Sequence, residues 1–322
     1  HSLSDRLRAT GHEVRELQLR ELDLRDCVGC FGCWVKRPGA CVVDDASHVI
    51  DAAVINSDLT IWASPLRMGF PSALLKRALD KSIPLIHPYF DVVQGEAHHR
   101  ARYARYPRFG LILEPEATTD DLDVDIVSNL LARTALNIKS SLSFATTTEA
   151  DLDWVVARIE SPDTAPLSAS PAGPLPGIRV APIRRLTLFN GSPRVRRGNT
   201  PILLDRLAQG FRSVPDRSVD LIHLNRTRES GRWLDAVAEA ECVWLGFPLY
   251  TDAMPGLVKG FIEHLEPLVG RTSNPPIGFL VQSGFPESAH SRYVERYLAR
   301  LAQRLKAPYL GTIVKGGGEG VR

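Results

Sequence analysis

Long apolar runs are missing from this sequence. None approaches the roughly 20 residues that a membrane-spanning helix requires, so we expect no membrane segment. A strong charge imbalance is missing too, because 39 Lys and Arg stand against 37 Asp and Glu, for a net charge of +2. A chain so close to neutral gives no electrostatic reason to expect a nucleic acid or a membrane surface as a partner. With 44% hydrophobic and 24% charged residues, the composition predicts a soluble globular protein.

Cysteine is scarce as well, but four of the five cysteines lie within fifteen residues, spaced C-x2-C-x2-C-x7-C. They are Cys27, Cys30, Cys33 and Cys41. Tight C-x2-C-x2-C runs are typical of iron–sulfur sites, whereas structural zinc usually takes two separated pairs or a pair followed by histidines. A cluster, zinc and free thiols all remain open. Nothing indicates an oxidising compartment, so we expect no disulfide and a cytoplasmic location.

The length of the chain and a linker-like segment predict two domains. A chain of 322 residues is too long for one ordinary domain. Residues 161–183 are rich in Pro, Ala, Ser and Gly, a composition typical of a linker. We therefore predict a domain over 1–160, a linker over 161–183 and a domain over 184–322. The chain opens at His1 in a helix-like stretch, so we expect further sequence upstream.

The two halves resemble each other. Residues 57–80 and 240–263 each read as an apolar strand, a Pro-Leu turn and a helix that opens at proline and carries a lysine at nearly the same place. This similarity suggests a duplication.

The second half alternates between strand-like and helix-like segments. Strands are predicted at 186–189, 219–224, 242–247, 277–281 and 309–314, and helices at 202–211, 257–265 and 291–305. Such alternation implies a parallel sheet covered on both faces. The first half is expected to repeat the scheme from its second strand, at 13–19, without the opening strand and the loop after it. The predicted fold is a doubly wound α/β domain, twice.

A candidate anion site follows the first strand of the second half. Ligands of such sheets bind beyond the carboxyl ends of the strands, at the topological switch point. There the loop at residues 190–200, Asn-Gly-Ser-Pro-Arg-Val-Arg-Arg-Gly-Asn-Thr, leads into a helix whose amides and dipole favour an anion. The loop is neither G-x-G-x-x-G nor a Walker sequence, so neither a nucleoside triphosphate nor a Rossmann-bound nicotinamide is indicated. The alternative is a polar turn in which Asn199 or Thr200 caps the helix.

Two motifs carry a resemblance to a known family. Gly-Ser-Pro-Arg-(x3)-Gly-Asn-Thr at 191–200, together with Gly-Phe-Pro-Leu-Tyr-Thr-Asp-Ala-Met-Pro at 246–255, resembles the flavodoxin-like NAD(P)H-dependent FMN reductases. The compact cysteine run resembles that of the iron–sulfur flavoprotein branch of this family. The resemblance implies two flavodoxin-like domains of three α/β/α layers, the first without its opening strand. It also implies FMN, a nicotinamide donor and a [4Fe–4S] cluster.

The resemblance also implies roles for individual residues. The FMN phosphate would be held by Ser192, Arg194, Gly198, Asn199 and Thr200. The isoalloxazine would lie along Pro248, Leu249, Tyr250 and Thr251, with Ser283 and Gly284 near its pyrimidine edge. The cluster would be ligated by Cys27, Cys30, Cys33 and Cys41.

The first half departs from this pattern. Its ring loop would be Ser64–Met68, but it has no phosphate loop, and its third loop, residues 114–121, is acidic. We therefore expect the flavin in the second half, and the first half to be a cluster carrier, a second flavin site or a decayed copy.

The sequence thus predicts a flavin-dependent oxidoreductase that passes electrons from NAD(P)H to a small-molecule or protein acceptor, with the flavin supplying the chemistry. Two alternatives are a flavodoxin-like electron carrier and a zinc-stabilised binding module. A homodimer is left open. Residues 98–108 mix bases and aromatics and are expected to form a solvated or subunit-facing loop rather than a nucleic-acid site.

Overall fold

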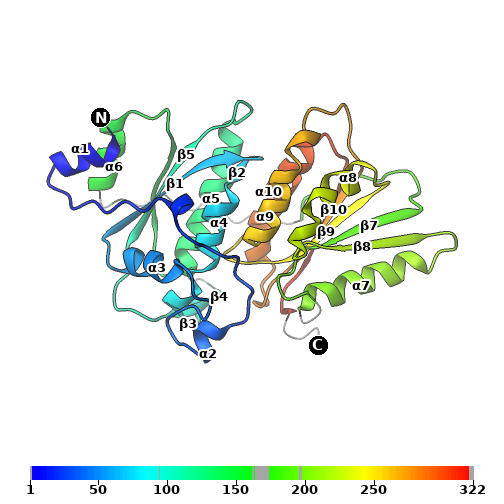
Figure 1. The fold of residues 1–322 in the computed structure, drawn as a ribbon, viewed down its shortest axis with the longest axis horizontal. Coiled ribbons are helices and arrows are strands. Elements are labelled where there is room, and N and C mark those ends of the chain that lie inside the picture. The colour runs from blue at the N-terminus through cyan, green and yellow to red at the C-terminus, as the bar shows by residue number, and fades with distance from the viewer. Residues whose placement is uncertain (1, 94, 162, 164–173, 196–197, 319–322) are drawn as a thin grey trace.

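The computed structural model describes residues 2–93, 95–161, 163, 174–195 and 198–318. Figure 1 shows two α/β units side by side, with helices α4, α5, α9 and α10 between them. Part of the predicted linker, residues 162 and 164–173, lies outside the described residues. The predicted domain boundaries therefore stay predictions.

The second half contains a five-stranded parallel sheet in the order β11-β10-β9-β7-β8. In chain order this is 2-1-3-4-5, the flavodoxin-like arrangement. The strands are β7 (Arg185–Asn190), β8 (Ser218–His223), β9 (Val243–Pro248), β10 (Ile277–Gln282) and β11 (Tyr309–Lys315). Each overlaps a predicted strand, so the doubly wound prediction is confirmed for this half.

Helices cover both faces of this sheet because its strands are apolar on both sides. Leu186 and Leu188 of β7 pack in a cluster with Leu204 of α7 (Asn199–Arg212) on one face. Phe189 belongs to the cluster on the other face, which α8 (Trp233–Ala238), α9 (Gly256–His264) and α10 (Ala289–Arg304) cover. Alternate residues of one strand thus enter two different cores, which gives the three expected layers.

The first half has a smaller sheet in the order β2-β1-β5-β6. Strands β1 (Leu59–Arg67), β5 (Arg108–Glu114) and β6 (Leu142–Thr147) are parallel, and the short β2 (Phe70–Pro71) pairs antiparallel with the end of β1. Helices α1 (Leu3–Ala9) and α6 (Leu152–Glu160) cover one face. The other face is covered by α3 (Ser47–Ile55), α4 (Ala73–Asp80) and α5 (Asp121–Asn137).

The strand predicted at 13–19 is wrong. This segment joins no sheet, and a short 3-10 turn begins at Leu19. Its partly buried residues are Val14, Leu17 and Leu19, and Val14 packs against a different cluster from the other two. Their spacing of three and then two does not keep the period of two that a strand needs to bury one face.

The loop expected at 98–108 is partly wrong as well. Residues up to Ala101 belong to β4 (Glu96–Ala101), which pairs antiparallel with β3 (Ile86–Val93) to form a hairpin between α4 and β5. A four-residue helix, α2 (Gly32–Val35), lies within the cysteine run.

The two halves meet through helices that cap one another. The Asp80 carboxylate of α4 accepts a hydrogen bond from Gly256 N, the first residue of α9, at 2.7 Å. The Glu263 carboxylate of α9 accepts one from Ala73 N, the first residue of α4, at 2.8 Å. Each carboxylate also pairs with a buried lysine of its own helix, Lys76 or Lys259. The two lysines that the sequence comparison aligned therefore belong to a pseudo-symmetric contact between the halves.

Candidate functional site

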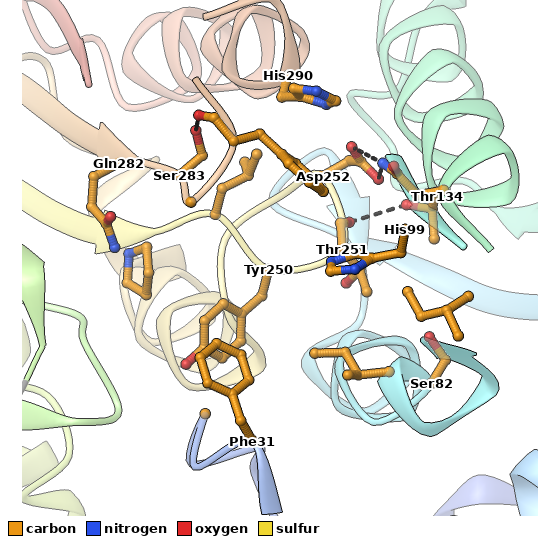
Figure 2. A pocket seen from close by; sticks show the side chains of 18 of the residues that line it. Phe31, Ser82, His99, Thr134, Tyr250, Thr251, Asp252, Gln282, Ser283 and His290 are labelled. Carbon is orange, nitrogen blue, oxygen red and sulfur yellow. Dashed lines mark hydrogen bonds between the residues drawn. The ribbon is translucent and has the colours of Figure 1, made fainter. Parts of the chain in front are cut away.

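A cavity of about 510 Å³ lies between the two halves, beyond the carboxyl ends of β7, β9 and β10. This is the switch point of the second sheet, since β7 has β8 on one side and β9 on the other. Its volume falls within the usual range of small-molecule sites. Figure 2 shows side chains of both halves around it, such as Phe31 and His99 from the first and Tyr250 and Ser283 from the second.

The structure brings the predicted cofactor residues together at this cavity. All but one of them line it, namely Ser192, Arg194, Gly198, Asn199, Pro248, Leu249, Tyr250, Thr251, Ser283 and Gly284. Thr200 is the exception, because it is fully buried in the first turn of α7. Residues 196 and 197 of the same loop lie outside the described residues.

The loop before α7 has the features of an anion cradle. Gly198 is the N-cap of this 14-residue helix and provides no capping side chain. A Cβ at Gly198 would lie 2.6 Å from Ser192 Oγ, so a larger residue here would displace the Ser192 side chain. Within the described part of the chain, the buried Thr200 Oγ1 has no hydrogen-bond partner. An orphaned hydroxyl at a helix N-terminus suits a phosphate, and so these residues fit the FMN phosphate.

The turn after β9 has a second feature that suits a flavin. Thr251 and Asp252 both have positive φ, 40° and 61°, so consecutive backbone N–H groups form a small concavity that binds anions or lone pairs. Among the described residues, no protein group accepts a hydrogen bond from either N–H. The turn fits a ligand that presents acceptor atoms, as the edge of an isoalloxazine does.

The matching turn of the first half donates its N–H groups to a protein carboxylate. Met68 and Gly69, with φ of 54° and 72°, donate their N–H groups to Glu116 at 2.7 and 2.9 Å. Glu116 comes from the acidic loop that the sequence marked as unsuited to an anionic cofactor. A cavity of about 430 Å³ remains beside it, lined also by Pro65 and Arg67. Because Glu116 occupies the turn, the geometry favours a decayed copy over a second flavin site.

Arg194 is held away from the anion cradle. Its Nε donates to Gly29 O at 2.5 Å, and its guanidinium lies 4.3 Å from the centre of the Phe31 ring, a cation–π distance. Both partners belong to the cysteine run. Arg194, which lines the cavity, thus links this run to it.

Gly29 is the tightest point of that contact. Its φ is +63°, and an added Cβ would lie 1.9 Å from Tyr250 Oη. Burial raises the pKa of the Tyr250 phenol, and the nearby Cys27 raises it further. The cysteine run therefore packs directly against the turn that lines the cavity.

We expect Gly29→Ala to destabilise the protein more than Gly11→Ala does. Gly11 also has positive φ, +91°, but nothing lies within 4 Å of an added Cβ. Gly11→Ala should cost only the backbone strain, whereas Gly29→Ala should cost about 1–3 kcal/mol more from overpacking. Urea unfolding of both variants measures the difference. Equal losses would show that the run does not pack on Tyr250.

The cysteines lie in one loop with amide and amine donors around them. Gly32 N and Val43 N each lie 3.4 Å from a sulfur, of Cys30 and Cys41 respectively. Lys81 Nζ lies 3.7 Å from Cys41 Sγ. Such N–H···S contacts are usual around thiolate clusters.

The four thiols are not assembled as a metal site in the structure. Burial raises the pKa of Cys27 to about 12 and that of Cys33 to about 11, with Cys41 and Cys30 adding to the rise at Cys33. Among the described residues, no three metal-ligating side chains are gathered at metal-binding geometry. The donor chemistry fits a thiolate-bound metal, but the arrangement does not fit one without movement of the loop.

Sequence reasoning missed the wall that the first half gives to the cavity. This wall contains Trp34, Phe90 and His99 together with Phe31. Phe90 and His99 come from the β3–β4 hairpin, of which only residues 98–101 belonged to the stretch predicted to be a loop. The aromatic residues of this hairpin were a weak signal, because their place at the cavity depends on how the two halves pack.

Comparisons with known proteins give structural neighbours only. No family model matches the chain, and no curated protein matches it. An azoreductase from Bacillus anthracis is 16% identical, with 43% of this chain and 93% of that chain covered, at a TM-score of 0.35. An NADH:FMN oxidoreductase is 17% identical, with 42% and 76% covered, at 0.36. An NADPH-quinone reductase from P. pentosaceus is 16% identical, with 42% and 86% covered, at 0.33.

These identities bear on the fold alone, and TM-scores below 0.5 add no argument about what this chain does. In the part of the chain that the structure describes, no helix has both the length and the apolar character needed to cross a membrane.

Proposed function

We propose that this chain is a flavin-dependent oxidoreductase that binds FMN in the cavity between its halves, takes electrons from NAD(P)H and delivers them to a small-molecule or protein acceptor. The observation that carries the proposal is the pairing of two unsatisfied donor sites in one cavity. One is the N-terminus of α7, where Ser192 lines the cavity and the buried Thr200 hydroxyl has no partner among the described residues, and the other is the turn at Thr251 and Asp252. Bound FMN would supply hydride and single-electron chemistry.

The residues of the chain would bind and orient the cofactor. Ser192, Asn199 and Thr200, with the amides of α7, would hold the phosphate. Pro248, Leu249 and Tyr250 would lie along the ring, and the N–H groups of the turn would donate to its acceptor edge. Ser283 and Gly284 would contact the pyrimidine side.

The cavity would also exclude water from the reacting groups. Its first-half wall is aromatic, and the half-buried Tyr250 of the second half packs against Gly29 of the cysteine run. Water excluded from the site strengthens every hydrogen bond made there. No side chain is required as a general acid or base in this proposal.

The glutamate of the first half supports the assignment of the turn. In the first half, the two N–H groups of this backbone shape donate to the two oxygens of the Glu116 carboxylate, so the shape suits a ligand with a pair of acceptor oxygens. The same shape in the second half faces the cavity, with no protein acceptor described there.

Titration of the FMN-free full chain with FMN tests the proposal. We expect saturable binding at about one FMN per chain, with quenching of the flavin fluorescence as the ring becomes buried. Riboflavin, which lacks the phosphate, should bind far more weakly. Equal binding of the two would place the phosphate outside the cradle, and no binding would remove the flavin from the proposal.

A finer part of the proposal concerns the metal. Cys27, Cys30, Cys33 and Cys41 would ligate a [4Fe–4S] cluster, for which the spacing and the N–H···S contacts provide support. The Arg194–Gly29 contact would keep the loaded loop beside the flavin.

Protein purified without oxygen should therefore contain about four irons per chain, and Cys33→Ala should lose most of them. Cys242→Ala is the matched control, because this cysteine is buried in the core of the second half and should leave the iron unchanged. Iron content and visible absorbance provide the measurement. Stoichiometric zinc would indicate a structural site, and a metal-free protein would indicate free thiols.

A further inference from the structure

The wall that the first half gives to the cavity is a set of aromatic rings with His99 in the middle. The His99 ring lies 4.8 Å from Trp34, 5.0 Å from Phe90 and 5.2 Å from Phe285, measured between ring centroids. Phe31 stacks on the far side of Trp34 at 5.1 Å, with 12° between the planes. Phe90 is 56% exposed although it lines the cavity, so this wall still has ring surface to cover.

Most polar side chains that the first half contributes to the cavity are already hydrogen-bonded within the protein. The donor–acceptor distances are 2.7–3.2 Å. Trp34 donates to Ile83 O and Ile86 O, and Ser82 donates to Leu79 O. Thr134 donates to Leu130 O and Thr251 O, and Asn137 donates to the Asp252 carboxylate. These groups hold the wall in place and have no donor left for a ligand.

His99 differs from them. Among the described residues, no side chain hydrogen-bonds to its ring, and its polar neighbour is the backbone of His87. Burial lowers the pKa of His99 to about 4, with Lys139 and His98 adding to the fall, so the ring is neutral at physiological pH. A neutral imidazole has one donor and one acceptor nitrogen. Within the described residues, the buried Nδ1 of His99 has no hydrogen-bond partner, so with the His87 backbone beside the ring as acceptor for its N–H, Nδ1 is the nitrogen left for a ligand.

We propose that this aromatic wall is the docking site for the ring of the reacting ligand, and that His99 positions the ring by accepting a hydrogen bond from it. The inference rests on the proposed function, in which the flavin lies along the second-half loops across the cavity. The ligand chemistry is a planar aromatic ring that carries an N–H or O–H donor. Two sources share this chemistry, the carboxamide of a nicotinamide and the hydroxyl of an arenol. Figure 2 shows His99 and Thr251 among the side chains around the cavity, so such a ring would share the cavity with the flavin turn.

Paired ligands test the role of His99 by equilibrium binding to the FMN-loaded full chain, followed by calorimetry. One pair is nicotinamide and N,N-dimethylnicotinamide, and the other is 2-naphthol and 2-methoxynaphthalene. Within each pair the ring is kept and the donor is removed. We expect the donor member of at least one pair to bind about tenfold more tightly, as one hydrogen bond in a dry site allows.

The variants are His99→Phe, which keeps an aromatic ring, and His99→Gln, which keeps an acceptor. His99→Phe should abolish the preference by weakening only the donor member, and His99→Gln should restore part of it. The control His264→Phe removes an exposed histidine whose ring contacts Gly260 O, and it should change nothing.

A preference in the nicotinamide pair alone would assign the wall to the electron donor, and one in the naphthol pair alone would assign it to the acceptor. A preference in both would make it a site that the two share in turn. Equal binding within both pairs, no binding of any ligand, or a preference that survives His99→Phe would overturn the proposal. The binding measurements do not depend on turnover. If NAD(P)H failed to reduce the bound FMN, the proposed function would be contradicted, but the binding test of the aromatic wall would still give a clear result.

Discussion

The double variant Ser192→Ala, Thr200→Val should bind FMN at least about a hundredfold more weakly than the native chain. Each hydroxyl would donate to a charged phosphate oxygen, and hydrogen bonds to charged groups contribute about 1.5–3 kcal/mol each. Both side chains are almost fully buried, so neither loss is made good by water. Fluorescence titration of the FMN-free protein measures the change.

Ser213→Ala is the matched control for this variant. Ser213 caps the opposite end of α7 and donates to Gly210 O, so its loss touches the helix but not its N-terminus. FMN affinity should be unchanged. A double variant that binds FMN as the native chain does would place the phosphate at another loop.

Replacing Asp80 by asparagine should cost about 3–5 kcal/mol of unfolding free energy. The change leaves the Lys76 ammonium buried without its counter-charge, which is the expensive way to break a buried ion pair. The same lysine donates to Tyr250 O and Thr251 Oγ1 at 3.0 and 2.7 Å, so we also expect the cavity turn to shift. Chemical unfolding of the full chain gives the first effect, and FMN affinity the second.

Two comparisons separate this cost from a general effect of losing a carboxylate. Asp153→Asn removes the partner of Arg6 in an exposed pair and should cost less than about 1 kcal/mol. Lys76→Met combined with Asp80→Asn should recover much of the loss, because no unpaired charge then remains. If Asp80→Asn cost no more unfolding free energy than Asp153→Asn, the reciprocal contact between α4 and α9 would not be a major source of stability.

The fold of the second half could be predicted from sequence because its strands are short apolar runs separated by amphipathic helices. β10 is an example, since all six of its residues are buried and it has no alternative exposed face. The first half gave weaker signals. The segment at 13–19 has apolar residues spaced too irregularly for a strand, and the β3–β4 hairpin carries exposed aromatics such as Tyr89 and Phe90 among its charges.

The candidate site likewise has a part that could be predicted from the sequence and a part that could not. The loop at Ser192–Thr200 and the turn at Pro248–Thr251 are local motifs, so their sequence predicted where they would lie. The placement of Arg194 on Gly29 and the position of His99 depend on how two distant halves pack, and no local pattern encodes that. The lysines at 76 and 259 were visible as a repeat, but their reciprocal partners across the junction were not.

Anaerobic mixing of the FMN-loaded full chain with NADH or NADPH tests the central claim most directly. The account predicts about one tightly bound FMN per chain and rapid bleaching of the flavin absorbance by at least one of the two nucleotides, followed by reoxidation when an acceptor is added. Bound flavin that neither nucleotide reduces would make the protein an electron carrier. A chain that binds no FMN would contradict the account altogether.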